Sequence, residues 1–135
     1  MFTTIVCGVH LDETARVAAN AARELAQQLG AALHLVFAFE GSAEPAHTAD
    51  PSDAPGRNEA ESFLAQFAAR GAQPITTHAL PGDPSAAILR VADEVGADLI
   101  VVGNKGMRGI HRVLGSVPSS IAHKASGAVL IVNTT

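Results

Sequence analysis

A glycine-rich, basic stretch, Gly103–Ser119, holds the residues whose types and spacing are best suited to chemistry. It follows the apolar run Leu99–Val102 directly and leads into a short segment of helical spacing that ends near Ala125. Exposed backbone N–H groups and the positive end of a helix dipole both favour bound phosphate. The stretch therefore predicts an anion site between a strand and a helix.

The charge distribution supports this prediction. From Leu99 to the end of the chain there are four basic residues and no acidic one, whereas the preceding part holds five basic and thirteen acidic residues. The basic part of the chain thus coincides with the glycine-rich stretch, as a polyanion site requires. The alternative is a short segment that merely lacks acidic residues.

Composition excludes several other classes. A net charge of −4 and the absence of Trp and Tyr argue against nucleic-acid binding, which uses basic surfaces and aromatic stacking. No apolar run is long enough to span a membrane and the chain starts without a charged-then-apolar leader, so we expect a cytoplasmic protein. The single cysteine, Cys7, is expected to be a buried structural thiol. With 135 residues, 1–135 is expected to be one domain.

Strand and helix patterns alternate along the chain. Apolar or β-branched runs predict strands at Phe2–Val9, Ala32–Phe39, Ile75–Leu80, Ala97–Val102 and Ala128–Val132. Helical spacing predicts four helices, which cover 12–29, Asn58–Arg70, 83–96 and Val117–Ala125. Asp12 and Asp83 are the predicted caps of the first and third helices, Pro84 takes the first position of the third, and the third ends at Gly96. Five strands joined by helical crossovers predict an α/β fold with one parallel sheet.

Three details of this pattern are specific. The first helix carries Val17, Ala18, Ala21, Leu25 and Leu29 at helical spacing, an alanine-rich face that suits close packing on the sheet. The polar run Ile75–Leu80 is typical of an edge strand. Residues 40–57, rich in proline and small polar residues, are expected to be a long mobile surface loop, either a plain connector or a lid.

The predicted architecture locates a ligand site independently of any motif. In open parallel sheets the ligand crevice lies beyond the carboxyl ends of the strands, where the strand order reverses. If the first and fourth strands are neighbours, the turn after Val9 and the loop after Val102 face the same crevice.

The residues of the glycine-rich stretch resemble the universal stress protein family. The family pattern is Gly, two residues, Gly, nine residues, then Gly-Ser or Gly-Thr, after the fourth strand. Here Gly103-Asn104-Lys105-Gly106 and Gly115-Ser116 are separated by eight residues. The resemblance extends through Asp83–Gly96, the strand ADLIVVG and the helix start GSVP, and leaves out residues 40–57.

This resemblance implies a Rossmann-like three-layer domain with four helices and a five-stranded parallel sheet of order 3-2-1-4-5, which binds ATP, with or without Mg²⁺, or AMP or cyclic AMP. The cofactor-binding residues it implies are Gly8, Val9, His10 and Ala38 at the ribose and base, Gly103, Lys105, Gly106, Met107 and Arg108 at the ribose and first phosphates, and Gly115, Ser116 and Val117 at the outer phosphates. This chain has His10 where ATP-binding members carry an acidic residue, and Pro118, in the first turn of the last helix, has no N–H to donate.

The sequence predicts binding and signalling rather than dedicated catalysis. No paired carboxylates or Ser/His/Asp arrangement can be recognised, and the six histidines show no ligand spacing, so neither a catalytic group nor a metal site is predicted. Ala128–Val132 is apolar on both faces at an expected sheet edge, which predicts a two-fold homodimer through antiparallel pairing. The alternatives are a dimeric interaction module that binds no nucleotide, and a slow ATPase.

Overall fold

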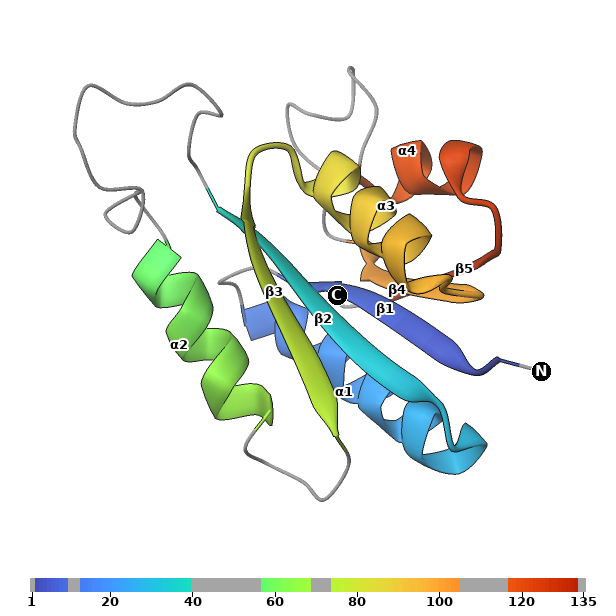
Figure 1. Cartoon of the computed structure of the whole chain (residues 1–135), viewed down its shortest axis with the longest axis horizontal. Coiled ribbons are helices and arrows are strands. Elements are labelled where there is room, and N and C mark those ends of the chain that lie inside the picture. The colour runs from blue at the N-terminus through green and yellow to red at the C-terminus, as the bar shows by residue number, and fades with distance from the viewer. Residues whose placement is uncertain (1, 10–12, 40–56, 69–73, 105–116, 134–135) are drawn as a thin grey trace.

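The computed structural model describes residues 2–9, 13–39, 57–68, 74–104 and 117–133, which form a sheet with helices on both faces (Figure 1). The strands are β1 (Thr4–Val9), β2 (Ala32–Phe39), β3 (Ile75–Pro81), β4 (Leu99–Gly103) and β5 (Ala128–Val132). The helices in these residues are α1 (Glu13–Leu29), α2 (Arg57–Ala68), α3 (Pro84–Val95) and α4 (Val117–Lys124). Every strand pair is parallel and the order is β3-β2-β1-β4-β5, so the predicted fold and strand order are confirmed.

Two apolar cores hold the layers together. On one face, α1 and α2 cover side chains of β1, β2 and β4 that include Ile5, Leu35 and Val101. On the other face, α3 and α4 cover the alternate side chains of the same strands, among them Val6 and Ile100. Because successive side chains of a strand point to opposite faces, a strand covered on both sides needs a continuous apolar run. The runs in β1, β2 and β4 meet that requirement.

The buried face of α1 differs in part from its predicted face. Ala18, Ala19, Ala22 and Ala26 are buried with at most 1% of their surface exposed, so the helix backbone lies close to the sheet as expected. Val17 and Leu29, however, are 45% and 44% exposed and are not part of the core. An α-helix has 3.6 residues per turn, and α1 is 17 residues long. The stripe of apolar residues predicted from the sequence therefore rotates away from the sheet at both ends of the helix.

Helix α3 begins and ends as its sequence predicts. The carboxylate of Asp83 accepts a hydrogen bond from the backbone N–H of Ala86 at 2.9 Å, and Pro84 takes the first helical position. At the other end Gly96 adopts a left-handed conformation with φ of 67°, and its N–H binds the Ala92 carbonyl. A glycine adopts this φ without the steric strain that a side chain would add.

The predicted cap at Asp12, the end of the second helix at Arg70 and Gly71, and the 40–57 loop fall outside the described residues, apart from Arg57, which begins α2. The fourth strand begins at Leu99, two residues later than predicted. No helix in the described part of the chain combines the length and hydropathy that crossing a membrane requires.

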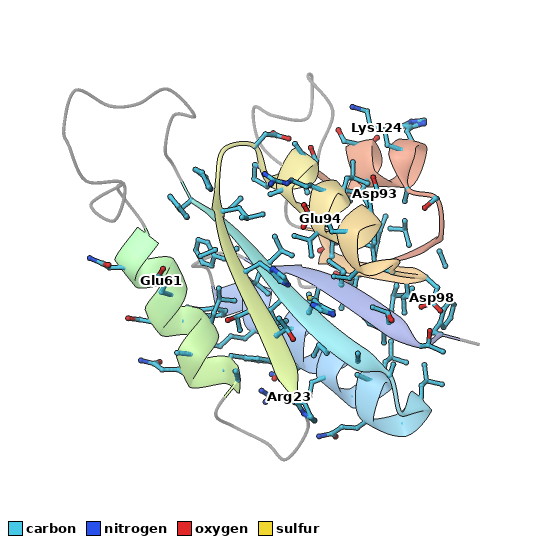
Figure 2. The ribbon with its side chains drawn as sticks, viewed as in Figure 1. Arg23, Glu61, Asp93, Glu94, Asp98 and Lys124 are labelled. Carbon is cyan, nitrogen blue, oxygen red and sulfur yellow. The ribbon has the colours of Figure 1, made fainter. Side chains whose placement is uncertain are left out.

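The amino end of the sheet is joined by Asp98, which precedes β4 and lies close to the start of β1 (Figure 2). Its carboxylate accepts hydrogen bonds from the backbone N–H groups of Thr3 and Thr4, and its N–H donates to the Thr4 carbonyl. Its own carbonyl accepts from the N–H of Ala128 at 3.1 Å. One residue therefore connects β1, β4 and β5.

Candidate functional site

The two central strands end at the same edge of the sheet and send the chain to opposite faces. β1 pairs with β4 in parallel, with Cys7 opposite Val101. The helix that follows β1 packs on one face, whereas the helix that follows the segment after β4 packs on the other. This is a topological switch point, and in open α/β sheets the ligand crevice lies outside the carboxyl ends of the strands at such a point.

Gly8 allows a close approach of helix α3 to the end of β1. A Cβ atom at Gly8 would lie 2.3 Å from Cδ1 of Ile88 and 3.5 Å from Cγ1 of Val102. Ile88 is 4% exposed and belongs to the core beneath α3 and α4. The glycine therefore has a packing function, whereas the family resemblance implies a ligand contact for it.

The start of α4 is fixed by an apolar contact. Pro118 is among the fully buried side chains and Ile121 is 0% exposed, while Val117 packs against the same core. Proline is well suited to the first turn of a helix because its N–H would have no helical partner there. Burial of Pro118 thus anchors the amino end of α4, where the positive end of its dipole lies.

Two asparagines join the ends of β4 and β5 at the carboxyl edge. Nδ2 of Asn104, the residue after β4, lies 3.3 Å from Oδ1 of Asn133, the residue after β5. Sequence reasoning missed this contact because the two residues lie far apart in the chain, and only the adjacency of β4 and β5 brings them together. The contact fixes the point from which the basic glycine-rich segment leaves the sheet.

Asp83 brings a negative charge to the carboxyl end of β3. The hydroxyl of Ser85 donates to its carboxylate at 2.6 Å, and this bond, followed by the bond from Ala86, lowers the pKa of Asp83. A carboxylate whose charge is already stabilised by a helix terminus is a structural cap rather than a proton-transfer group.

The structure brings together the predicted site residues that it describes. Gly8 and Val9 end β1, Ala38 lies near the end of β2, Gly103 ends β4 and Val117 begins α4, all at the carboxyl edge. The other predicted site residues lie outside the described residues: His10, Lys105, Gly106, Met107, Arg108, Gly115 and Ser116. Val9 is 6% exposed in the core beneath α1, so its side chain is turned away from the face that Gly8 and Ala38 share.

Cys7 is a structural thiol, as predicted. It is 0% exposed in the core beneath α1, and burial raises the pKa of its thiol to about 12. Because the thiolate is the nucleophile and the metal ligand, this cysteine is unreactive at neutral pH. Within the described ranges, no three side chains of His, Cys, Asp or Glu gather in an arrangement for a metal ion.

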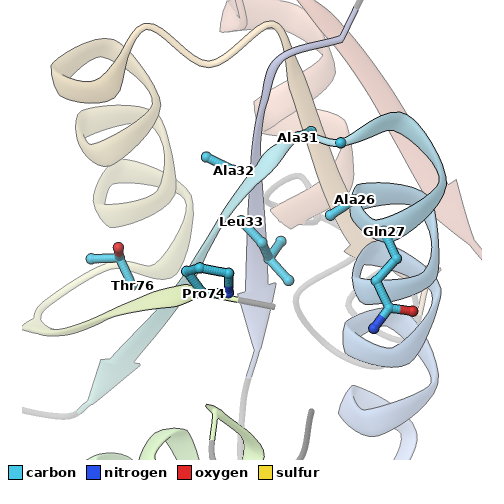
Figure 3. A pocket seen from close by; sticks show the side chains of 8 residues that line it. Ala26, Gln27, Ala31, Ala32, Leu33, Pro74 and Thr76 are labelled. Atoms are coloured by element: carbon cyan, nitrogen blue, oxygen red, sulfur yellow. The ribbon is translucent and has the colours of Figure 1, made fainter. Parts of the chain in front are cut away.

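A cavity of about 590 Å³ opens at the opposite end of the sheet (Figure 3). It lies between the end of α1, the segment leading into β2 and the start of β3, and is lined by Ala26, Gln27, Gly30, Ala31, Ala32, Leu33, Pro74 and Thr76. The described residues of its lining are mainly apolar and include no charged side chain. These residues lack the groups that would hold a phosphate.

The five strands form one parallel sheet with its switch point between β1 and β4, and glycines lie near the carboxyl ends of both strands. These features define a Rossmann-like α/β fold. The model of the universal stress protein family matches residues 1–133. The chain belongs to this family.

Individual relatives agree with this assignment. A universal stress protein solved in complex with cAMP is 32% identical, with 99% of this chain and 98% of that chain covered and a TM-score of 0.78. UspA from Lactobacillus plantarum is 27% identical, with 98% of each chain covered and a TM-score of 0.75.

A curated relative matches over a shorter segment. The universal stress protein Rv1636 of Mycobacterium tuberculosis strain H37Rv is 46% identical over 66 residues, which is 48% of this chain and 45% of that relative. The match thus spans about half the length of the curated protein. The solved structure of Rv1636 is 31% identical with 99% of this chain and 97% of that chain covered, at a TM-score of 0.59.

Proposed function

We propose that this chain binds an adenine nucleotide at the carboxyl edge of the sheet and transmits its bound state through contacts with other chains. The observation that carries the proposal is the switch point between β1 and β4, because the basic glycine-rich segment begins where β4 ends. A relative that is 32% identical over nearly the whole chain has been solved with cAMP, which supports an adenine nucleotide as the ligand.

The proposed contacts follow the order of the elements along the edge. The base and ribose lie against Gly8, Val9, His10 and Ala38. The ribose and first phosphates lie against Gly103, Lys105, Gly106, Met107 and Arg108, and the outer phosphates against Gly115, Ser116 and Val117. ATP, with or without Mg²⁺, uses all of these contacts, whereas AMP and cyclic AMP use the first two sets.

Positive charge and helix geometry both favour phosphate at this place. The segment between β4 and α4 carries Lys105, Arg108 and Arg112, and the amino end of α4 follows it. Pro118 supplies no N–H, so the hydroxyl of Ser116 and the N–H of Val117 are the donors we assign to the outer phosphates. Binding rather than hydrolysis is the activity we expect, since the sequence offers no recognisable general base for Ser116.

Isothermal titration with ATP, AMP and cyclic AMP tests the site, using Gly106→Asp, Ser116→Ala and the control Ser126→Ala. The aspartate places a negative charge among the phosphates and should abolish detectable binding. Loss of a hydrogen bond to a charged group costs about 1.5–3 kcal/mol, so Ser116→Ala should weaken ATP binding by roughly 10- to 100-fold. Ser126, before β5 at the amino end of the sheet, should be neutral.

The three titrations separate the competing functions. Absence of binding by the parent chain removes the nucleotide proposal and leaves the interaction module. Equal affinity in the parent and both site variants removes the assigned residues but not nucleotide binding itself. Release of ADP from ATP at a rate above a no-protein control would show an ATPase.

We further propose that β5 forms a homodimer by antiparallel pairing with its copy. β5 is an edge strand, and Leu130 and Ile131 are 38% and 40% exposed. Unpaired backbone groups beside exposed apolar side chains favour strand addition. Leu130→Lys should convert a dimer to a monomer in light scattering, whereas Leu29→Lys, at an equally exposed leucine on α1, should not. A monomeric parent chain contradicts this proposal.

We also propose that the protein is cytoplasmic, and cell fractionation tests this location.

A further inference from the structure

Two histidines from neighbouring strands lie in contact on the sheet. Nδ1 of His34, in β2, is 3.1 Å from Nε2 of His78, in β3, and the ring centroids are 5.3 Å apart with a tilt of 30°. In the strand register His34 faces Thr76 and His78 faces Val36, so the histidines are diagonal neighbours. Val36 and Leu80 each follow one of the histidines by two residues, and both pack in the core beneath α3 and α4. Residues two apart in a strand share a face, so the histidines lie on that face of the sheet.

The separation of the two nitrogen atoms equals the span of adjacent ligands on a transition-metal ion. Metal–imidazole bonds are about 2.0–2.1 Å long, so two of them span about 2.9 Å at a right angle and about 3.3 Å at the tetrahedral angle. The observed 3.1 Å lies between these values. We propose that His34 and His78 form a two-histidine site for a borderline divalent transition-metal ion such as Cu²⁺ or Zn²⁺, which takes the place of the proton shared between the rings.

Both imidazoles are half-buried on this face of the sheet. Burial is the main cause that lowers the pKa of each histidine; His78 lowers the pKa of His34 further, whereas Glu94 opposes the shift at His78.

Helix α3 places an ion pair in the surroundings of the histidines. Glu94 lies in its last turn (Figure 2), close enough to affect the pKa of His78, and is paired with Arg90 at 3.1 Å. Because the charges of Glu94 and Arg90 oppose each other, the ion pair adds little net charge near the site. Since no third ligand of the described residues joins the histidines, water completes the coordination, and imidazole ligands then favour Cu²⁺ over Zn²⁺ and Ni²⁺.

Titration of the full chain, freed of metal with EDTA and exchanged into buffer, tests the site. CuCl₂ and ZnCl₂ are added to the parent chain, to His34→Gln and His78→Gln, and to His123→Gln as a control on the exposed surface of α4. Glutamine preserves most of the side-chain volume but does not replace the imidazole lone pair. We expect one ion per parent chain, binding weakened about tenfold or more in either site variant and unchanged in the control, and Cu²⁺ tighter than Zn²⁺.

A direct measurement on the parent chain covers the case in which a variant does not fold. In two-dimensional NMR of the imidazole nitrogens, Zn²⁺ should shift Nδ1 of His34 and Nε2 of His78 together, at the same ion concentration. The proposal is overturned if neither ion binds, if the affinities of the site variants equal that of the parent chain, or if only the signals of other histidines move. It does not depend on nucleotide binding.

Discussion

Replacing Gly127 with alanine should destabilise the junction of β4 and β5. A Cβ atom at this position would lie 2.8 Å from the carbonyl oxygen, 3.1 Å from the carbonyl carbon and 3.2 Å from Cα of Asp98. Ordinary contacts of carbon atoms lie at about 3.5–4.0 Å, so the two backbones must separate by about half an ångström. The atoms that the new Cβ would meet belong to the backbone of Asp98, which hydrogen bonds to Thr4 and Ala128 hold in place, so they cannot move aside as the end of a flexible side chain could.

The hydrogen bonds around Asp98 explain why moving its backbone costs free energy. Its carbonyl accepts from the N–H of Ala128, its N–H donates to the Thr4 carbonyl, and its carboxylate binds the backbone of Thr3. Overpacking costs about 1–3 kcal/mol, and a weakened hydrogen bond adds about 0.5–1.5 kcal/mol. Lower entropy of the unfolded chain offsets about 0.4–1 kcal/mol. The free energy of unfolding should therefore fall by about 2 kcal/mol.

Urea unfolding followed by circular dichroism measures this change. With a slope of about 2 kcal/mol per molar urea, the midpoint should fall by roughly 1 M and the slope should remain the same. Hydrogen exchange at the amide of Ala128 should accelerate, because its acceptor is the displaced carbonyl. Ser126→Ala, one residue earlier, should stay within about 0.5 kcal/mol of the parent chain. A Gly127→Ala variant as stable as the parent chain, or with unchanged protection of Ala128, would refute the reasoning.

Two further predictions concern the other end of β1 and the acid range. Gly8→Ala should lower the free energy of unfolding by about 1–2 kcal/mol, and much of this loss should be absent in a chain that also carries Ile88→Val, because valine lacks the methyl group that the new Cβ would meet. Urea unfolding of the single and double variants measures this, and strictly additive changes in the midpoint would contradict the proposed contact. Hydrogen bonds, above all the one from the N–H of Thr3, lower the pKa of Asp98 in the folded chain below its ordinary 3.8. The ionised carboxylate therefore stabilises the fold fully above pH 3.8, and this contribution is lost as the pH falls through the pKa of the folded chain. Asp98→Asn should be less stable at neutral pH and show a shallower loss of stability below about pH 4, and identical acid profiles of the two chains would contradict this assignment.

Much of the fold could be predicted because its signals are local. The apolar runs of β1, β2 and β4 indicate strands buried on both faces, and Asp83-Pro84 indicates where α3 begins. The polar character of Ile75–Leu80 correctly indicated an edge strand. Periodicity was less reliable at the ends of α1, where Val17 and Leu29 are exposed, because a helix touches the sheet along a limited line.

The sequence predicted where the candidate site lies, but it did not predict the contacts that support the site. The family resemblance implied a ligand contact at Gly8, yet the approach of Ile88 depends on how α3 packs, which no spacing reveals. The glycine pattern predicts phosphate binding by the stretch Gly103–Ser119, of which residues 105–116 lie outside the described structure. Their assignment therefore stays a prediction until the titrations are made.

The sequence by itself determined the alternation of strands and helices and the coincidence of positive charge with the glycine-rich stretch, because these depend on neighbours along the chain. Only the tertiary structure decided which distant residues meet. Asn104 reaches Asn133 and His34 reaches His78 because neighbouring strands fix their register through backbone hydrogen bonds. The histidines showed no metal-ligand spacing in the chain, and their 3.1 Å contact arises from the pairing of β2 with β3.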